Sequence, residues 1–514
     1  MSMHISSAAR LLVRAVVLPG IAIAIAVGLR AQNVQNFDLV VANGRVLDPE
    51  SGLDSVRNIG INGSKIITIS TDRLTGRRMI DATGLVVAPG FIDLHAHGQT
   101  PETYEYQARD GVTSALELEV GTGDVDKWYG ERKTGRLINY GASIGHIPVR
   151  MIVLRDPGNF LPSGDGAYRV ASPSEIKEIA RRIAEGLEKG AVDIGAGFAY
   201  TPGANRDELL EVFRVAHQYR VPVHVHIRRG PAGLKEAIDL ASSAGASLHV
   251  VHINSAGGAQ TREMLQMITD AKARGLDVTT EAYPYSAGMT EIQSANLDEY
   301  QKGTDERLAS LEWPRTGERL NRESFEKYRR LGGPVILHTN TDEMVAVAIN
   351  SPLTMIASDA YWENGTGHPR TTGTYSKVLG RYVREARSLT LMDAIRKMTL
   401  MPAQRLEARV ASMKSKGRLR AGADADITVF DSARVIDRST YREPSLSPAG
   451  IRHVIVNGTP IIANGQRVAG VNPGVAIRAL PTASVAQFLA SENAAAAIKK
   501  SGMDPSSSRD RERR

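Results

Sequence analysis

Pairs of histidines mark three strand-like segments of this 514-residue chain. FIDLHAH, VPVHVHIR and SLHVVHI each carry two histidines, and a fourth segment, LTMIASD, ends in Asp359. Side chains at positions i and i+2 of a strand point to the same side, so His95 and His97 can bind one cation together. Neutral imidazoles and carboxylates are typical ligands of zinc and similar first-row divalent ions, so the pattern predicts a metal centre. The other two pairs are His224 with His226 and His249 with His252.

Strand-like and helical segments alternate from residue 93 to residue 416, which predicts parallel βαβ units. Further strand-like segments are TSALELEV, AVDIGAGFAY, LDVTTEAYPY and GPVILHT, whereas SPSEIKEIARRIAEGLEKG and RDELLEVFRVAHQY are helical. About eight strands fit a closed (β/α)8 barrel of the TIM type better than an open sheet. The C-terminal ends of the strands form the active face of such a barrel, and the histidine pairs and Asp359 stand at those ends.

Hairpin-like strands flank the predicted barrel on both sides. Alternating apolar residues, interrupted by Asn-Gly and Gly turns, run from residue 37 to residue 92, and the same pattern recurs from residue 417 to residue 475. The two flanks most simply pair with each other, which predicts one small β-sandwich domain beside the barrel of residues 93–416. Residues 476–514 end in SGMDPSSSRDRERR, which has no apolar period, so we expect a largely disordered tail.

Residues 1–31 are typical of a secretory signal peptide. Arg10 and Arg14 precede the apolar run 15–29, and Leu29, Arg30 and Ala31 form a passable cleavage site. A helix of that length spans about 22 Å, short of the roughly 30 Å hydrocarbon core of a bilayer. The sequence therefore predicts an exported protein, periplasmic or secreted, with no stable membrane insertion after cleavage.

The composition excludes several classes of function. The chain has no cysteine, which excludes disulfides, thiolate metal sites and a cysteine nucleophile. The formal net charge is +7, but residues 1–31 and residues 499–514 each carry a net +3, which leaves +1 on the rest. A nearly neutral body gives no electrostatic footprint for nucleic acid, so we expect no nucleic-acid partner.

Several motifs resemble those of the metal-dependent amidohydrolase superfamily: PGFIDLHAH, the two later histidine strands, SPLTMIASD and GRLRAGADADITVFD. More narrowly, EGLEKGAVDIGAGFAYTPGA, VHINSAGG, AYPYSAGMT and HPRTTGTYSKVLGRYVRE are similar to segments of the N-acyl-D-amino-acid deacylases, or D-aminoacylases. The resemblance covers about residues 37–465. It implies a barrel enzyme that hydrolyses C–N bonds with one or two divalent metal ions.

The resemblance also implies the ligands of two metal ions. His95 and His97 would hold one ion together with Asp359, and His226 and His252 would hold the other. Zinc is the metal that these residue types and the resemblance predict. The substrate would be a small amide that carries a free carboxylate.

The ligand that bridges the two ions must differ from that of the family, which usually supplies a cysteine just after the strand that follows His-x-His. This chain has no cysteine, and TSALELEV offers Glu119 or Glu117 at that place. Both carboxylates lie on one face of the strand, and Glu119 is closer to the C-terminal end, where the barrel opens. We therefore expect Glu119 to bridge, with Glu117 as the alternative. A carboxylate in place of a thiolate hardens the site, so Mn or Co could replace zinc.

The reaction that the resemblance implies converts an N-acyl-D-amino acid to a D-amino acid and a carboxylate. A divalent ion lowers the pKa of a bound water to about 7, so hydroxide is available at neutral pH. Asp359 would act as general base toward the water and as general acid toward the leaving amine. Arg370 would bind the free carboxylate of the substrate through its planar guanidinium, assisted by Tyr283 and Tyr200.

Three alternatives compete with that activity. A cyclic amidase or lactonase of the hydantoinase type and a dipeptidase belong to the same superfamily, whereas a non-catalytic binding scaffold is of another class. The hydantoinase type usually bridges its metals with a carboxylated lysine, and no lysine ends a suitable strand here. A scaffold is expected to lose ligands, and this chain keeps all five histidine and aspartate positions. Asn254 stands where the deacylases often carry a lysine, which weakens the expected hold on an α-carboxylate.

Three histidines of these segments, His224, His249 and His338, are not among the expected metal ligands. His224 shares a face with His226 and is an alternative ligand or a partner of one. His249 is expected to be structural. His338, which ends GPVILHT, faces the active end of its own strand and could touch the substrate.

Overall fold

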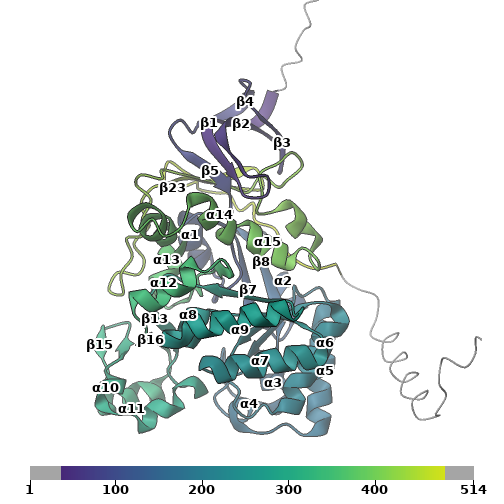
Figure 1. Ribbon diagram of the computed structural model, residues 1–514, viewed down its shortest axis with the longest axis vertical. Helices are drawn as coiled ribbons and strands as arrows, with labels where there is room; N and C mark the ends of the chain where they lie inside the picture. Colours follow the sequence, from purple (N-terminus) through teal and green to yellow (C-terminus); the bar gives the residue numbers. More distant parts are fainter. Residues whose placement is uncertain (1–35, 481–514) are drawn as a thin grey trace, which may run out of the picture. The chain divides into compact units, whose positions relative to one another are not determined.

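The computed structural model describes residues 36–480, so the predicted signal peptide and residues 481–514 lie outside the described residues. Eight parallel strands follow one another in the order β6 to β12 and then β17, and Figure 1 labels β7 and β8 of them. A parallel bridge between Ala96 and Ala360 joins the chain just after β6 and β17 and nearly closes the barrel. The predicted (β/α)8 architecture is therefore confirmed. The strands are β6 (Phe91–Asp93), β7 (Val112–Thr122), β8 (Asn139–Gly145), β9 (Ile194–Gly197), β10 (Pro222–His226), β11 (Ser247–Val250), β12 (Val278–Ala282) and β17 (Thr354–Ile356).

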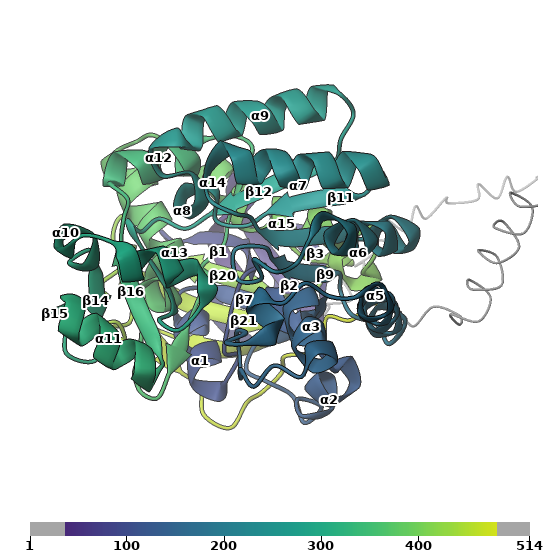
Figure 2. The ribbon, with the colours of Figure 1, turned by 90° about the horizontal axis from the view of Figure 1, so that it is seen from below.

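Helices surround these strands and connect them (Figure 2). At the start of α5 (Pro173–Glu188), the side chain of Ser172 accepts a hydrogen bond from the backbone N–H of Glu175. The side chain of Glu175 accepts one from the backbone N–H of Ser172, so two N–H groups that have no partner within the helix are satisfied. Ile179 and Ile183 recur at the helical period and are buried, so the helix packs on the barrel through one apolar face. The other main helices are α1 (Pro101–Arg109), α3 (His146–Leu154), α6 (Arg206–Tyr219), α7 (Gly230–Ala244), α9 (Thr261–Ala273), α12 (Asp342–Asn350), α13 (Arg370–Lys377), α14 (Leu391–Met398) and α15 (Leu400–Leu406), and the shorter ones include α2 (Val125–Gly130), α4 (Asp165–Tyr168) and α8 (Ile253–Gly257).

One strand of the barrel differs from the sequence prediction. GPVILHT, predicted as a barrel strand, forms β16 (Pro334–His338), which pairs antiparallel with two strands of a separate sheet. The barrel strand that the sequence did not reveal is β8, NYGASIG, because glycine, asparagine and, to a lesser degree, alanine have low strand propensity. Every residue of β8 is buried, so its place between β7 and β9 makes it a strand.

The separate sheet has four strands and a small core of its own. It is inserted in the chain between β12 and β17. Trp313 and Tyr328 stack with ring centroids 4.1 Å apart, and Phe325 is fully buried beside them. This insertion places β13 against the pocket described below. Its elements are β13 (Ala287–Glu291), β14 (Leu311–Trp313), β15 (Glu318–Arg319), β16, α10 (Asp305–Leu308) and α11 (Arg322–Leu331).

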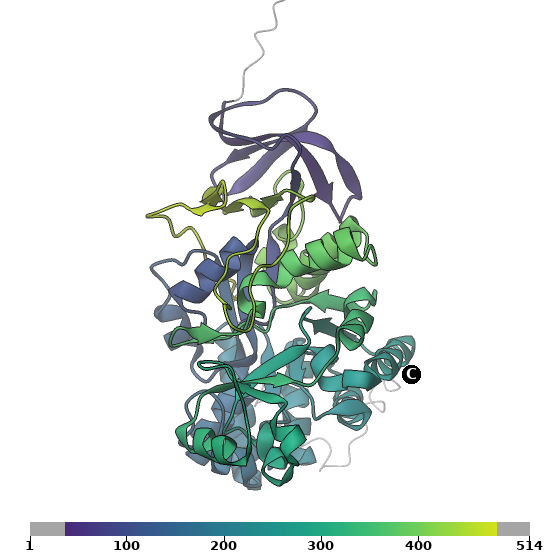
Figure 3. The ribbon, with the colours of Figure 1, turned by 90° about the vertical axis from the view of Figure 1, so that its left-hand side faces the viewer.

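The two flanks of the barrel pair into one nine-stranded sheet (Figure 3). β20 joins them by pairing antiparallel with β5, with Ile427 opposite Pro89. Leu39, Ile59 and Val429 belong to the apolar core that the sheet buries. The strands are β1 (Asn36–Asp48), β2 (Leu53–Asn62), β3 (Lys65–Ser70), β4 (Thr75–Asp81), β5 (Val86–Pro89), β20 (Ile427–Phe430), β21 (Ile451–Val456), β22 (Thr459–Ala463) and β23 (Gln466–Arg467).

The last described residues pack against the barrel. The backbone N–H of Ile477 donates to Tyr140 O at 2.7 Å, and Tyr129 Oη donates to Ile477 O at 2.7 Å. Ile477 and Ala479 are buried, so residues 476–480, which the sequence places in the tail, pack against the barrel. Among residues 36–480, no helix is both long and apolar enough to cross a membrane.

A buried ion cluster joins the nine-stranded sheet to the barrel. Lys416 Nζ lies 2.7 Å from Asp426 Oδ2 and 2.9 Å from Asp424 Oδ2, and its side chain is 2% exposed. Asp426 also accepts a hydrogen bond from Asn139 of β8 at 2.9 Å. Asp424 has a second cation, Lys65, whereas Lys416 is the cation that contacts Asp426.

Lys416→Met is therefore expected to lower the free energy of unfolding by about 3–5 kcal/mol, because it leaves the buried carboxylate of Asp426 without its cation. Denaturant titration followed by circular dichroism measures the change. Lys235→Met is the matched control, since Lys235 pairs with Asp239 at the surface and such pairs contribute little. Equal losses in the two variants would contradict the prediction.

Candidate metal centre

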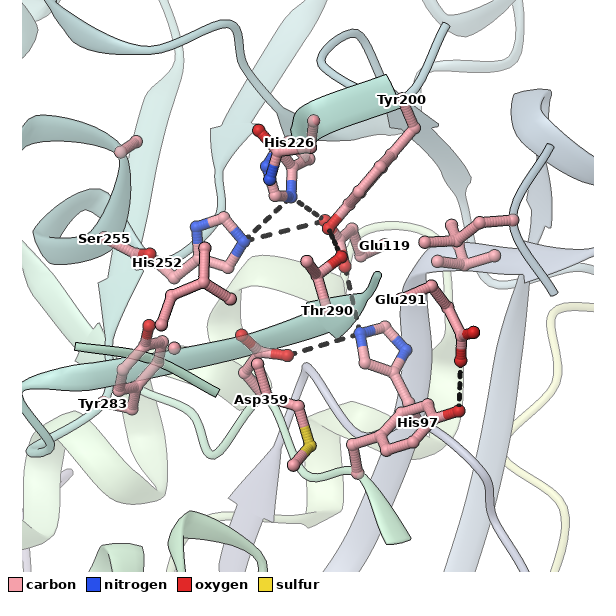
Figure 4. A pocket seen from close by; sticks show the side chains of 18 of the residues that line it. His97, Glu119, Tyr200, His226, His252, Ser255, Tyr283, Thr290, Glu291 and Asp359 are labelled. Atoms are coloured by element: carbon pink, nitrogen blue, oxygen red, sulfur yellow. Dashed lines mark hydrogen bonds and ion pairs between the residues drawn. The ribbon is translucent and has the colours of Figure 1, made fainter. Parts of the chain in front are cut away.

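Five barrel strands bring the six predicted metal ligands to one place, and Figure 4 shows all of them except His95. β6 leads into His95 and His97, β7 carries Glu119, and the remaining three follow β10, β11 and β17. His252 and Asp359 have φ angles of 31° and 52°. This left-handed conformation is uncommon for a residue with a Cβ, and such backbone strain is concentrated at functional sites.

The first cluster consists of His95, His97, Glu119 and Asp359, which each offer a ligand atom within 4.8 Å of the others. The Nε2 atoms of His95 and His97 lie 3.0 Å apart, and Glu119 Oε2 lies 2.9 Å from the former and 3.0 Å from the latter. Asp359 Oδ1 completes the group, 3.4 Å from His97 Nε2. All four residues are buried. The His-x-His strand therefore presents both imidazoles to one point.

The second cluster consists of Glu119, His226 and His252. Glu119 Oε1 lies 2.5 Å from His226 Nδ1 and 3.6 Å from His252 Nε2. The two oxygens of Glu119 thus face different clusters, Oε2 the first and Oε1 the second. This is the arrangement that a carboxylate needs in order to bridge two ions.

Glu117, the alternative bridge, lies behind His97. Its carboxylate oxygens are 2.9 and 3.0 Å from His97 Nδ1, the nitrogen that faces away from the first cluster. Its Oε1 also accepts from the backbone N–H of Val120 and Gly121. Glu117 belongs to neither cluster and instead orients the imidazole of His97.

A second supporting carboxylate, Glu281 of β12, was not singled out from the sequence. Its Oε1 lies 2.6 Å from His95 Nδ1, and its Oε2 lies 3.1 Å from His249 Nε2. The ring of His224 stacks on that of His249 at 4.3 Å, and His224 Nε2 lies 3.0 Å from Asp193. His224 and His249 are therefore outside both clusters. The acid within the buried strand VTTEA was the signal that could have identified Glu281.

The charge of the first cluster fits a divalent cation. Burial lowers the pKa of His95, but the carboxylates of Asp359, Glu119 and Glu281 outweigh burial and raise it to about 10. Buried carboxylates carry negative charge that is costly without a counter-ion, and a metal ion bound between them and the imidazoles would neutralise it. Nitrogen and oxygen donors without thiolate suit zinc, and also manganese or cobalt.

A pocket opens onto both clusters, and the three predicted substrate-binding residues line it. The side chain of Arg370 is 1% exposed, and its Nη2 lies 2.9 Å from Asp359 Oδ1. Among the described residues, Arg370 Nε and Nη1 and the hydroxyl of Tyr283 have no hydrogen-bond partner. The guanidinium lies over the Tyr283 ring at 4.7 Å. Tyr200 stands on the other side, with its ring 4.5 Å from that of His226 (Figure 4).

His338 and Asn254, which the sequence analysis related to substrate binding, are not among the residues that line this pocket. His338 is on β16, and its Nε2 lies 3.0 Å from Glu312, so it belongs to the four-stranded sheet. Its neighbours Leu337 and Thr339 line the pocket instead. Asn254 is fully buried and donates to Tyr283 O at 3.2 Å, so it supports the backbone beside the pocket.

The chain is similar to known proteins over most of its length. Residues 86–461 match the Amidohydrolase family. The N-acyl-D-glutamate deacylase of Alcaligenes xylosoxydans xylosoxydans is 31% identical over 480 residues, which cover 83% of this chain and 94% of that protein. The D-aminoacylase of the same organism is 28% identical over 480 residues, with 83% and 95% covered.

A solved structure resembles the chain over nearly its whole described length. It is the N-acyl-D-glutamate deacylase from Bordetella bronchiseptica, complexed with zinc and a phosphonate inhibitor that mimics the tetrahedral intermediate of its reaction. It has a TM-score of 0.75 and 26% identity, and the match covers 87% of this chain and 100% of that one. The chain therefore belongs to the amidohydrolase family and is a metal-dependent hydrolase that acts on C–N bonds.

Proposed function

We propose that this chain hydrolyses N-acyl-D-amino acids to a D-amino acid and a carboxylate. The observation that carries the proposal is Arg370, a buried guanidinium beside Asp359 that has two donors without a partner among the described residues. Buried donors without a partner require an acceptor, and the α-carboxylate of such a substrate supplies one that matches a planar guanidinium, next to the metal clusters. The activities by which the two Alcaligenes relatives are named support the amide and the D configuration.

The first and second clusters would each hold one divalent ion, zinc by the chemistry of their donors, with Glu119 between them. When bound, the ions would polarise the scissile carbonyl and lower the pKa of water at the site to about 7. Glu117 and Glu281 hold the outer nitrogens of His97 and His95, so the inner nitrogens stay directed at the first cluster.

Asp359 is the proposed proton carrier. Its Oδ1 stands between Arg370 Nη2, at 2.9 Å, and His97 Nε2, at 3.4 Å. From this position the carboxylate can take a proton from the attacking water and deliver it to the leaving nitrogen. Arg370 and Tyr283 would hold the substrate's carboxylate next to Asp359.

Amine release from N-acetyl-D- and N-acetyl-L-amino acids tests the proposal, with the metal-loaded full chain as the enzyme. We expect release from the D-series and loss of that release when a chelator removes the metal. Opening of a cyclic amide without amine release would favour a hydantoinase-type activity. No release from either series would overturn the substrate assignment and leave the family unaffected.

Arg370→Met is expected to raise KM by about 10- to 100-fold, because a hydrogen bond to a charged group contributes about 1.5–3 kcal/mol. Steady-state kinetics on an N-acetyl-D-amino acid measures the change. Arg370→Lys is the control, since it keeps the charge and loses only the bidentate geometry, and it should recover part of the affinity. An unchanged KM in the methionine variant would show that the carboxylate binds elsewhere.

The sequence of residues 1–31 supports a further proposal, that the protein is exported through a cleaved signal peptide. Fractionation of the producing cells and mass spectrometry of the mature N-terminus test it. We expect the protein in the periplasm or the medium, with an N-terminus close to residue 32. A cytoplasmic protein that keeps Met1 would overturn the proposal.

A further inference from the structure

The loop of residues 155–164, between α3 and α4, carries two apolar side chains to the pocket. Phe160 and Leu161 both line it. The Phe160 ring meets the ring of His97 edge-on at 5.4 Å between centroids and lies 5.9 Å from the ring of Tyr361. Leu161 is buried in an apolar cluster with Tyr200. Phe160 therefore forms an apolar wall directly beside the first cluster.

The carboxylate of Asp156 organises this loop. Its Oδ1 accepts from the backbone N–H of Gly158 at 2.8 Å and of Ser163 at 3.0 Å. Its Oδ2 accepts from the N–H of Gly164 at 2.8 Å and of Gly166 at 2.7 Å. Burial raises the pKa of Asp156, but these four N–H groups outweigh burial and hold the pKa below its usual value. One side chain thus ties together both ends of the segment that bears Phe160.

The chain around this loop is packed too closely to admit a side chain at Gly158 or Gly166. A Cβ on Gly158 would lie 2.2 Å from Leu161 O, and a Cβ on Gly166 would lie 2.9 Å from the Cβ of Asp156. The buried guanidinium of Arg150 on α3 donates from Nε to Gly166 O at 2.7 Å, which anchors the far end of the loop. Helices α3 and α4 lie side by side (Figure 1). The position of Phe160 therefore depends on the contacts of Asp156.

We propose that Phe160 is a specificity-determining residue that contacts the apolar part of the substrate, and that Asp156 is the positioning residue that holds it there. The proposal rests on the proposed hydrolysis of N-acyl-D-amino acids. The two groups of such a substrate that can be apolar are the amino-acid side chain and the acyl chain. Either would gain from burial against an aromatic ring beside the reacting centre.

Asp156→Ala is expected to raise KM about tenfold for a substrate with a large apolar group, the factor that corresponds to 1.4 kcal/mol of lost contact. The value of kcat should change little and metal content should stay the same, because Asp156 touches neither cluster. N-acetyl-D-alanine, which offers little apolar surface, should be affected far less. Asp165→Ala is the matched control, since Asp165 is an acid of the same region that pairs with Arg169 at the surface.

Two substrate series distinguish the apolar groups. N-acetyl-D-leucine and N-acetyl-D-phenylalanine vary the side chain, and N-butanoyl- and N-hexanoyl-D-alanine vary the acyl chain. Phe160→Ala should reproduce the effect of Asp156→Ala in the same series. Because Asp156 acts through Phe160, the double variant should be no worse than either single variant. Additive losses, or a loss that is equal for large and small substrates, would overturn the proposal.

Hydrogen exchange of peptides that cover residues 155–168 provides a readout that needs no substrate. Asp156→Ala should speed exchange there and leave peptides of β7 and α5 unchanged, whereas Asp165→Ala should not. Unchanged exchange would overturn the positioning role of Asp156. If the wild-type enzyme releases amine from no N-acyl-D-amino acid, the proposed function fails first, and the substrate contact assigned to Phe160 fails with it.

Discussion

Asp359→Asn is expected to lower kcat by about 10²- to 10⁴-fold, the usual contribution of a general acid–base group. Asparagine keeps an oxygen where Asp359 Oδ1 now lies 3.4 Å from His97 Nε2, but it cannot accept and return a proton at the pH of the reaction. Steady-state kinetics with metal analysis of the same samples measures the effect. Metal should be largely retained while turnover is lost, which separates proton transfer from ligation.

The control for this variant is Asp342→Asn, because Asp342 is an exposed acid at the start of α12. Its kcat should equal that of the wild type. A loss of less than tenfold in Asp359→Asn would mean that another group carries the proton. Complete loss of metal in that variant would instead make ligation the main role of Asp359.

Glu119→Gln and Glu117→Gln are expected to differ sharply in metal content. Glu119 directs one oxygen to each cluster, so its replacement removes a negative charge shared by both sites and turns an amide N–H₂ toward one of them. We expect the Glu119 variant to hold less than one ion per chain after dialysis. Glu117 only orients His97, so its variant should bind metal about 10- to 100-fold more weakly and remain loaded at high metal concentration.

Metal titration followed by elemental analysis compares the two variants directly. Both replacements have the same size and the same charge change on the same strand, so each serves as the control of the other. Equal retention of metal in both would contradict the bridging position of Glu119. A greater loss in Glu117→Gln would assign the bridge to Glu117.

Local sequence patterns were sufficient for most of the fold. Helix α5 begins after a serine with glutamate three residues on and repeats its apolar residues with the helical period, so it could be located without the structure. The hairpins within each β flank could be recognised in the same way from alternating apolar residues and Gly turns. The helix and the hairpins depend on contacts between residues close in the chain, which periodicity records, whereas the two flanks join through β5 and β20, which are far apart in the chain.

Strand membership of the barrel depended on tertiary packing. NYGASIG has weak strand propensity and becomes β8 because its neighbours in the barrel bury it completely. GPVILH has strong strand propensity and is a strand, but in the inserted sheet, because propensity does not specify a partner. The strand character of GPVILH was therefore predictable from its residues, whereas the strand character of NYGASIG and the assignment of each strand to a sheet were not.

The sequence by itself determined the types and spacing of the metal-binding residues. His-x-His, the later histidines and Asp359 each stand at the end of a strand, and this position can be located without knowing the distances between their side chains. Only the tertiary structure decided between Glu119 and Glu117, because both share one face of β7 and differ by their height in the barrel. It also revealed Glu281 behind His95 and Asp156 beneath Phe160. Those roles arise from contacts between segments far apart in the chain, or from the path of a loop, and neither leaves a periodic pattern in the sequence.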